Sequence, residues 1–257
     1  MSSLDGKTVL ITGSGAGLGQ GVAIAAAKAG AHVIVTSLSD NGAETKRLIE
    51  EAGGKATWVK CDVTDRAAVD NAVEESVRVT GRLDGMVHNA FARPMWDKDP
   101  RVGSVSKMTM ELWQHEASVA LRGAYYCATA SYPHLRDAKG RLILVSSAAG
   151  LEGTPTQSAY AACKGALRGM TKSLAREWGH DRITVNAVSP YVATPSFNAW
   201  WEKKPELKKE GEALTSLGYI GDPEQDVAPA FTFLLSDDSH YITGQTFSVD
   251  SGRYLSL

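Results

Sequence analysis

The chain has 257 residues, of which 43% are hydrophobic and 22% are charged, and these values are typical of a globular protein. Its formal net charge of −2 gives no bulk attraction to nucleic acid or to an anionic membrane, so we predict neither as a partner. The three cysteines, Cys61, Cys127 and Cys163, are too few and too scattered for a disulfide framework or a metal site, so we predict no bound metal.

The first residues contain no charged segment followed by a long apolar run, so they do not resemble a secretory signal. No apolar run approaches the ~18 residues of a membrane-spanning helix. The expected location of the protein is therefore the cytoplasm.

Short apolar runs alternate with helical patterns along the chain. The predicted strands are Thr8–Ile11, Ala31–Thr36, Thr57–Cys61, Leu83–His88, Gly140–Val145, Ile183–Val188 and Thr246–Val249. The predicted helices are Val22–Ala27, Gly42–Ala52, Asp65–Val79, Met110–Ala130, Tyr160–Trp178 and Pro223–Leu235. This alternation predicts βαβ crossovers and a parallel sheet in an α/β fold. No repeat or linker divides the chain, so we expect a single domain over residues 1–257.

The first predicted strand runs directly into the glycine-rich segment TGSGAGLG at 12–19, and a strong helix former follows. A strand, a glycine-rich turn and a helix in this order are typical of dinucleotide binding. Glycines allow backbone N–H groups to approach a pyrophosphate, and the helix N-terminus favours its negative charge. The spacing is Gly-x-x-x-Gly-x-Gly, and the alternative is a tight loop in an unrelated α/β fold.

Ser37 follows the second predicted strand, at the position that contacts the adenosine ribose in this architecture. A carboxylate at this position would repel a 2′-phosphate, whereas serine does not, so the sequence favours NADP(H) over NAD(H). We expect no arginine or lysine close by to bind that phosphate. Asp40 is near enough to leave NAD(H) open.

Tyr160 and Lys164 are four residues apart, which places both side chains on one face of a helix. At ~4 Å and an effective dielectric constant of ~20, the ammonium favours the phenolate by ~4 kcal/mol, or ~3 pKa units. We therefore expect Tyr160 to titrate near neutrality and to act as a general acid or base. Ser147 ends an apolar strand at the edge where open α/β sheets bind ligands. An isolated pair of this spacing would more simply be a surface pair.

Two segments are predicted to form the substrate pocket, namely the long connection over 91–107 and a lid over about 194–218. The candidate pocket residues are Phe91, Met95, Trp96, Tyr191, Phe197, Trp200 and Trp201. They favour a bulky or ring-containing apolar ketone or secondary alcohol. A carrier-protein-linked ketoacyl substrate stays open, and Trp96 could instead cover the core.

Taken together, the motifs resemble the short-chain dehydrogenase/reductase family in its form of about 250 residues. The motifs that carry the resemblance are TGSGAGLG at 12–19, CDVTD at 61–65, HNA at 88–90, VSS at 145–147, YAACK at 160–164, NAVSPYVATP at 186–195 and DDSHYITGQTFSVDSG at 237–252. The resemblance covers nearly the whole chain. It implies a three-layer, Rossmann-like α/β fold with a seven-stranded, mostly parallel sheet and helices on both faces. It also implies hydride transfer with a nicotinamide cofactor, and frequently a homotetramer.

The resemblance implies a role for each matching residue. Ser147 would donate to the substrate oxygen, Tyr160 would be the acid/base, and Lys164 would hold the nicotinamide ribose and lower the pKa of Tyr160. The implied cofactor contacts are Gly13, Gly17, Leu18 and Gly19 with the pyrophosphate, Asp62 and Val63 with the adenine, Asn89 beside the ribose, and Pro190, Val192 and Thr194 on the carboxamide side of the nicotinamide.

Four residues depart from the family pattern. Ala120 replaces an asparagine that supports a water relay to Lys164. His88 replaces a common asparagine, and Tyr191 and Ser251 replace glycines. A backbone carbonyl could still hold that water, so we expect an active NAD(P)-dependent short-chain alcohol dehydrogenase or ketoreductase. The alternatives are a catalytically weak dinucleotide-binding sensor or partner protein, and a reductase acting on an activated carbon–carbon double bond.

Overall fold

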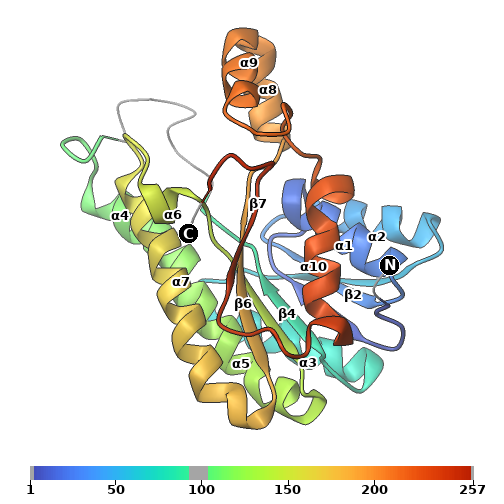
Figure 1. The fold of residues 1–257 in the computed structure, drawn as a ribbon. Helices are drawn as coiled ribbons and strands as arrows, with labels where there is room; N and C mark the ends of the chain where they lie inside the picture. The colour runs from blue at the N-terminus through green and yellow to red at the C-terminus, as the bar shows by residue number, and fades with distance from the viewer. Residues whose placement is uncertain (1–2, 93–103, 256–257) are drawn as a thin grey trace.

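The computed structural model describes residues 3–92 and 104–255. In this part of the chain, seven parallel strands form one sheet in the order β3-β2-β1-β4-β5-β6-β7 (Figure 1). The strands are β1 (Thr8–Ile11), β2 (His32–Ser37), β3 (Lys55–Lys60), β4 (Gly85–His88), β5 (Arg141–Val145), β6 (Thr184–Pro190) and β7 (Thr246–Val249). The predicted Rossmann-like α/β fold is confirmed, and every strand pairing in the sheet is parallel.

Helices cover both faces of the sheet, because the central strands are apolar on both sides and must be buried on both. One layer is formed by α1 (Gly17–Lys28), α2 (Gly42–Glu51) and α10 (Ala228–Leu235), and the opposite layer by α3 (Arg66–Thr80), α5 (Gly123–Ala138) and α7 (Ser158–Trp178). Shorter elements are α4 (Met110–Ala117), α6 (Ala149–Glu152), η4 (Gly179–Asp181), η5 (Pro223–Val227) and η6 (Asp237–Ser239). Each layer closes a separate hydrophobic core against the sheet.

The helix that we predicted over Met110–Ala130 differs from the prediction in two ways. It contains a π-helical turn, η3 (Ser118–Arg122), between α4 and α5, and it continues to Ala138. The last turns stay helical because Ser131 and Leu135 are buried in the core beneath them. π-Helical turns are frequent at functional sites in proteins.

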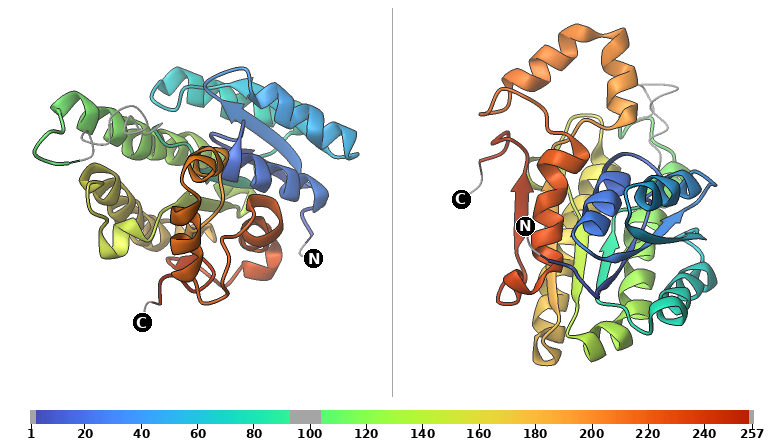
Figure 2. Two further views of the ribbon diagram at one scale, coloured as in Figure 1. Left: turned by 90° about the horizontal axis from the view of Figure 1, so that it is seen from above. Right: turned by 90° about the vertical axis from the view of Figure 1, so that its right-hand side faces the viewer.

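Parallel strands place all their carboxyl ends at one edge of the sheet. Two helices, α8 (Pro195–Lys203) and α9 (Pro205–Ala213), stand clear of the sheet above that edge (Figures 1 and 2). They lie in the segment that we predicted to be a lid. None of the helices in residues 3–92 and 104–255 has the length and apolar character that a bilayer crossing requires.

Ser251, which replaces a common glycine, adopts a backbone φ of 60°. This left-handed conformation favours glycine over residues with a side chain. The hydroxyl of Ser251 is also buried and has no hydrogen-bond partner among the described residues. The position therefore keeps the backbone geometry of a glycine turn although the side chain has changed.

Candidate active site

The glycine-rich turn follows β1 and lies close to the segment after β4. Gly13 and Gly17 adopt φ values of 63° and 59°, which glycine tolerates without strain. A Cβ at Gly13 would lie 2.9 Å from the Cα of Ala90, so only glycine permits this approach. Likewise, a Cβ at Gly19 would overlap the carbonyl oxygen of Gly13. The turn is therefore closely packed against the segment after β4.

The turn fits a pyrophosphate. The N-cap of α1 is Ala16, whose side chain has no acceptor, so it does not bond the first N–H groups of the helix. These groups and the positive end of the helix dipole favour a bound anion. Thr194 and Pro195, which follow β6, lie on the other side of Gly17, 3.6 Å from the position that a Cβ there would take.

Asn89 fixes the turn to the end of β4. Its side-chain amide donates to the carbonyl oxygens of Thr12 and Gly13, at 3.0 and 3.1 Å. The neighbouring His88 is fully buried, and its ring contacts the Ala120 carbonyl oxygen through Nε2 at 3.1 Å. The carbonyl oxygen of Ala120 therefore has a side-chain partner in the protein.

The two residues that we predicted beside an adenine ring come directly after β3. The Asp62 carboxylate accepts hydrogen bonds from the backbone and the hydroxyl of Thr64, both at 2.8 Å. Val63 is buried and packs against Gly123, so that a Cβ at Gly123 would lie 3.0 Å from its side chain.

Ser37 ends β2, but its hydroxyl is already used inside the protein. It donates to the Ser39 carbonyl at 2.6 Å and accepts from the Gly42 N–H and the Trp58 indole at 3.1 and 3.0 Å. Ser37 thus helps to shape this corner and has no free proton for a phosphate.

Lys60 is a cation that sequence proximity missed. It lies opposite Ser37 in the β2–β3 register, and its ammonium donates to Asp40 at 3.0 Å. Our expectation that no lysine stands near Ser37 is therefore wrong, because Lys60 is its neighbour on the adjacent strand. Strand pairing brings Lys60 to it from 23 positions along the chain.

Tyr160 and Lys164 lie one turn apart in α7, and the helix is bonded directly to the end of β5. The Lys164 ammonium donates to the Val145 carbonyl at 2.7 Å, and the Ser146 hydroxyl donates to the Lys164 carbonyl at 2.9 Å. Gly150 allows α6 to approach the α7 backbone closely. These contacts bring Ser147 close enough to Tyr160 to affect its pKa.

The expected shift of the Tyr160 pKa is wrong in sign. Burial raises the pKa of Tyr160 above its ordinary value, and this effect exceeds the lowering by a hydrogen bond from Ser147. The carboxylate of Glu116, on α4, raises it further. Burial also lowers the pKa of Lys164 to about 8, because the charged form is desolvated. Our Coulomb argument omitted burial, which acts on both groups.

Phe91 lies directly on the Tyr160–Lys164 pair. Its ring meets the Tyr160 ring edge to face at a centroid distance of 4.9 Å, and the Lys164 ammonium lies 4.7 Å from its centre. Cys163, between the two residues in the helix, stays a thiol because burial raises its pKa to about 11.

Of the other predicted pocket residues, Tyr191 contacts the projecting helices. Its hydroxyl lies 2.8 Å from the position that a Cβ at Gly211 of α9 would take. Its ring also lies under the guanidinium of Arg253, which pairs with Glu152 at 3.4 Å. Arg253, near the carboxyl terminus, carried no sequence signal for this contact.

In α8, Phe197 stacks on the buried Trp201 at a centroid distance of 5.3 Å. Met95, Trp96 and the neighbouring Arg93 lie outside the described residues, as does the side chain of Trp200.

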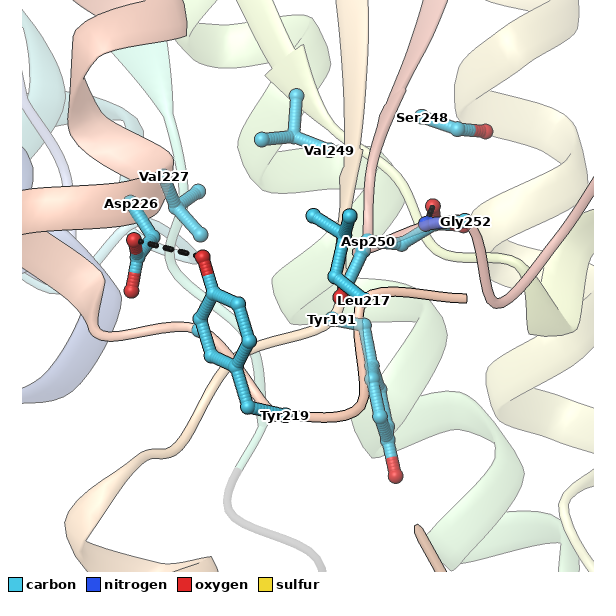
Figure 3. Close-up of a pocket in the computed structure, with 11 residues that line it drawn as sticks. Tyr191, Leu217, Tyr219, Asp226, Val227, Ser248, Val249, Asp250 and Gly252 are labelled. Atoms are coloured by element: carbon cyan, nitrogen blue, oxygen red, sulfur yellow. Dashed lines mark hydrogen bonds between the residues drawn. The ribbon is translucent and has the colours of Figure 1, made fainter. Parts of the chain in front are cut away.

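Tyr191 also borders a pocket of about 300 Å³ between the end of the lid segment and β7 (Figure 3). Leu217, Tyr219, Asp226 and Asp250 line it with Tyr191, and the Tyr219 hydroxyl donates to Asp226 at 3.2 Å. None of Ser147, Tyr160 and Lys164 lines this pocket. In the described residues, no three His, Cys, Asp or Glu side chains are grouped to hold a metal.

The chain matches known proteins along nearly its whole length. The family model described as "Enoyl-(Acyl carrier protein) reductase" matches residues 13–253. The 3beta-hydroxysteroid dehydrogenase 1 of Eggerthella lenta is 36% identical over 98% of this chain and 95% of its own length. The 3-oxoacyl-(acyl-carrier-protein) reductase FabG of Thermotoga maritima is also 36% identical, over 97% of this chain and 98% of its own length.

A solved structure has the same fold. It is that of a provisionally assigned short-chain alcohol dehydrogenase from Sinorhizobium meliloti 1021, and it superposes with a TM-score of 0.86 at 34% identity. The match covers 98% of this chain and 97% of that one.

Proposed function

Since the chain belongs to the short-chain dehydrogenase/reductase family, we propose that it is an NAD(P)(H)-dependent oxidoreductase that interconverts a ketone and a secondary alcohol. The observation that carries the proposal is the meeting of Ser147, Tyr160 and Lys164 at the carboxyl end of β5, the same sheet edge as the glycine-rich turn after β1. These residues fill the roles that proton transfer to a carbonyl requires, which favours catalysis over mere dinucleotide binding.

In the direction of reduction, the hydroxyls of Ser147 and Tyr160 donate hydrogen bonds to the substrate carbonyl oxygen. Tyr160 holds its proton at neutral pH, because burial raises its pKa, and it gives this proton to the oxygen as negative charge develops there. The bound nicotinamide supplies the hydride. Lys164 keeps a positive charge beside the phenolate that remains, which stabilises the charge-separated state more than the ground state.

The substrate is proposed to be bulky and apolar, with a ring. Phe91 presents its ring at the catalytic pair, and Tyr191, Phe197 and Trp201 supply aromatic area near the lid helices. The names of the two relatives support a steroid-like or a ketoacyl-like ketone as the first compounds to test. Closure of α8 and α9 over the carboxyl edge is proposed to exclude water during turnover.

We also propose that the protein works in the cytoplasm as a homotetramer, as the family resemblance implies. Light scattering coupled to gel filtration would show four chains per particle, whereas a monomer would contradict the assembly.

Tyr160→Phe is expected to lower kcat at least ~10²-fold, because the proton donor is lost while the ring packing on Phe91 is kept. The measurement is ketone reduction and alcohol oxidation over a panel of ring-bearing and acyl substrates with both cofactors. The far-ultraviolet circular dichroism and the cofactor affinity of the variant serve as controls. Turnover within tenfold of wild type would exclude Tyr160 as the acid, and no turnover of any compound by the wild type would favour the sensor alternative.

The rate of ketone reduction is expected to fall as the pH rises through about 8, because Lys164 then loses the proton that its pKa of about 8 retains at lower pH. The rate falls on the alkaline side because burial lowers the pKa of Lys164, and the charged ammonium persists only below that pKa. The measurement is the pH profile of kcat at saturating cofactor. A profile that stays flat from pH 7 to about 10, the ordinary lysine range, would contradict a role for the ammonium.

Lys60→Met is expected to raise KM for NADPH about tenfold, because it removes the cation that lies opposite Ser37. Asp40→Asn is expected to lower KM for NADPH, because it releases Lys60 from its 3.0 Å ion pair. KM for NADH, which has no 2′-phosphate, is the matched control and should change less than twofold. Equal changes for both cofactors would show that Lys60 does not contact that phosphate.

A further inference from the structure

His88 is a buried histidine that the proposed chemistry does not use. It ends β4, directly before Asn89, and only 1% of its surface is exposed. Its ring is placed between two parts of the site that are far apart in the sequence. On one side Nδ1 lies 3.4 Å from the Thr12 hydroxyl, and on the other Nε2 lies 3.1 Å from the Ala120 carbonyl oxygen.

The chemistry of its partner fixes the direction of the hydrogen bond at Nε2. A carbonyl oxygen can only accept, so Nε2 carries the proton and donates to Ala120. Burial and the nearby Lys164 charge lower the pKa of His88 to about 3, so the ring is neutral and Nδ1 is an acceptor. The one proton of the Thr12 hydroxyl has two acceptors at 3.4 Å, which are Nδ1 of His88 and the Val87 carbonyl oxygen. The ring therefore bridges Thr12 and Ala120, and Nδ1 is one of the two acceptors that Thr12 can use.

The Thr12 end of this bridge belongs to the cofactor turn. The Thr12 hydroxyl accepts hydrogen bonds from the backbone N–H groups of Asn89 and Ala90, both at 3.0 Å. Ala90 is the residue whose Cα a Cβ at Gly13 would meet at 2.9 Å. The Thr12 hydroxyl oxygen therefore helps to hold the end of β4 against the glycine-rich turn.

The Ala120 end belongs to the catalytic side. Ala120 lies in the π-helical turn η3, which packs against α7, the helix of Tyr160 and Lys164. The start of α5, which follows η3 directly, lies close to the ring, since a Cβ at Gly123 would lie 3.1 Å from Cε1 of His88. His88 thus gives a backbone carbonyl of this irregular helical turn a side-chain hydrogen-bond partner.

We propose that His88 is a positioning residue that joins the cofactor turn to the catalytic helix, one ring nitrogen serving each side. This inference rests on the proposed oxidoreductase function. The Thr12 bond sets the cofactor turn, so it governs cofactor affinity. The Ala120 bond sets the π-helical turn against α7, so it governs the rate of the chemical step.

Two substitutions separate the two bonds. The amide of His88→Asn reaches the place of Nδ1 and can still accept from Thr12, but it is too short to replace Nε2. The amide of His88→Gln reaches the place of Nε2 and can still donate to Ala120, but it removes Nδ1 and leaves Thr12 only the Val87 carbonyl oxygen as an acceptor. We expect His88→Asn to lower kcat about tenfold with the cofactor Kd within twofold of wild type. We expect His88→Gln to raise the cofactor Kd about tenfold with kcat within twofold.

His32 provides a matched control. It is also a partly buried histidine, and its ring is hydrogen-bonded to the Thr57 hydroxyl at 2.9 Å. It begins β2, however, and so lies at the amino ends of the strands, away from the carboxyl ends that carry the site. His32→Asn and His32→Gln should leave both constants within twofold of wild type. Cofactor Kd is measured from the quenching of protein fluorescence by NADH and NADPH, kcat with the best ketone of the panel, and the thermal midpoint of each variant by circular dichroism.

The split between the two variants supports the inference. Three results overturn the inference and leave the proposed function intact. In the first, both variants impair kcat and cofactor binding together and their thermal midpoints fall in parallel. In the others, neither constant changes, or His88→Asn weakens cofactor binding while His88→Gln lowers kcat. If the wild type binds neither cofactor or reduces no ketone, the proposed function fails, and the inference fails with it.

Discussion

The hydrogen bond from the Lys164 ammonium to the Val145 carbonyl, at 2.7 Å, is the contact on which the rest of the site depends. It carries a buried positive charge, with 3% of the side chain exposed, to the carboxyl end of a central strand. The returning bond from Ser146 to the Lys164 carbonyl closes a second link between the same two elements. Together these bonds fix the depth and rotation of α7, and so the position of Tyr160.

The sheet supplies the other half of the site. Because all strands are parallel, the turns after β1, β4, β5 and β6 meet at one edge, and each carries a different part of the chemistry. The glycine-rich turn fits a pyrophosphate, Asn89 ties that turn to β4, and Ser147 follows β5. The fold therefore brings together residues as far apart in the sequence as Gly17 and Thr194.

Much of this could be predicted from the sequence, because the informative patterns are local. The alternation of apolar runs and helices gave the parallel sheet, and the four-residue spacing of Tyr160 and Lys164 gave their common face. Properties that depend on packing could not be predicted in this way. The sign of the Tyr160 pKa shift depends on burial, which a pairwise distance estimate does not contain. Lys60 reaches Ser37 only through strand register, and the π-helical turn at Ala120 has no signature in residue spacing.

The competition between burial and charge at Tyr160 and Lys164 is the central claim, and the tyrosine signals themselves test it. The protein would be labelled with carbon-13 at the tyrosine ζ position, with Tyr160→Phe used to assign the Tyr160 signal, and titrated without cofactor. If burial dominates, Tyr160 keeps the chemical shift of a neutral phenol up to about pH 10, the ordinary tyrosine value. A transition to the phenolate near pH 7 would contradict the account and restore the purely Coulombic one.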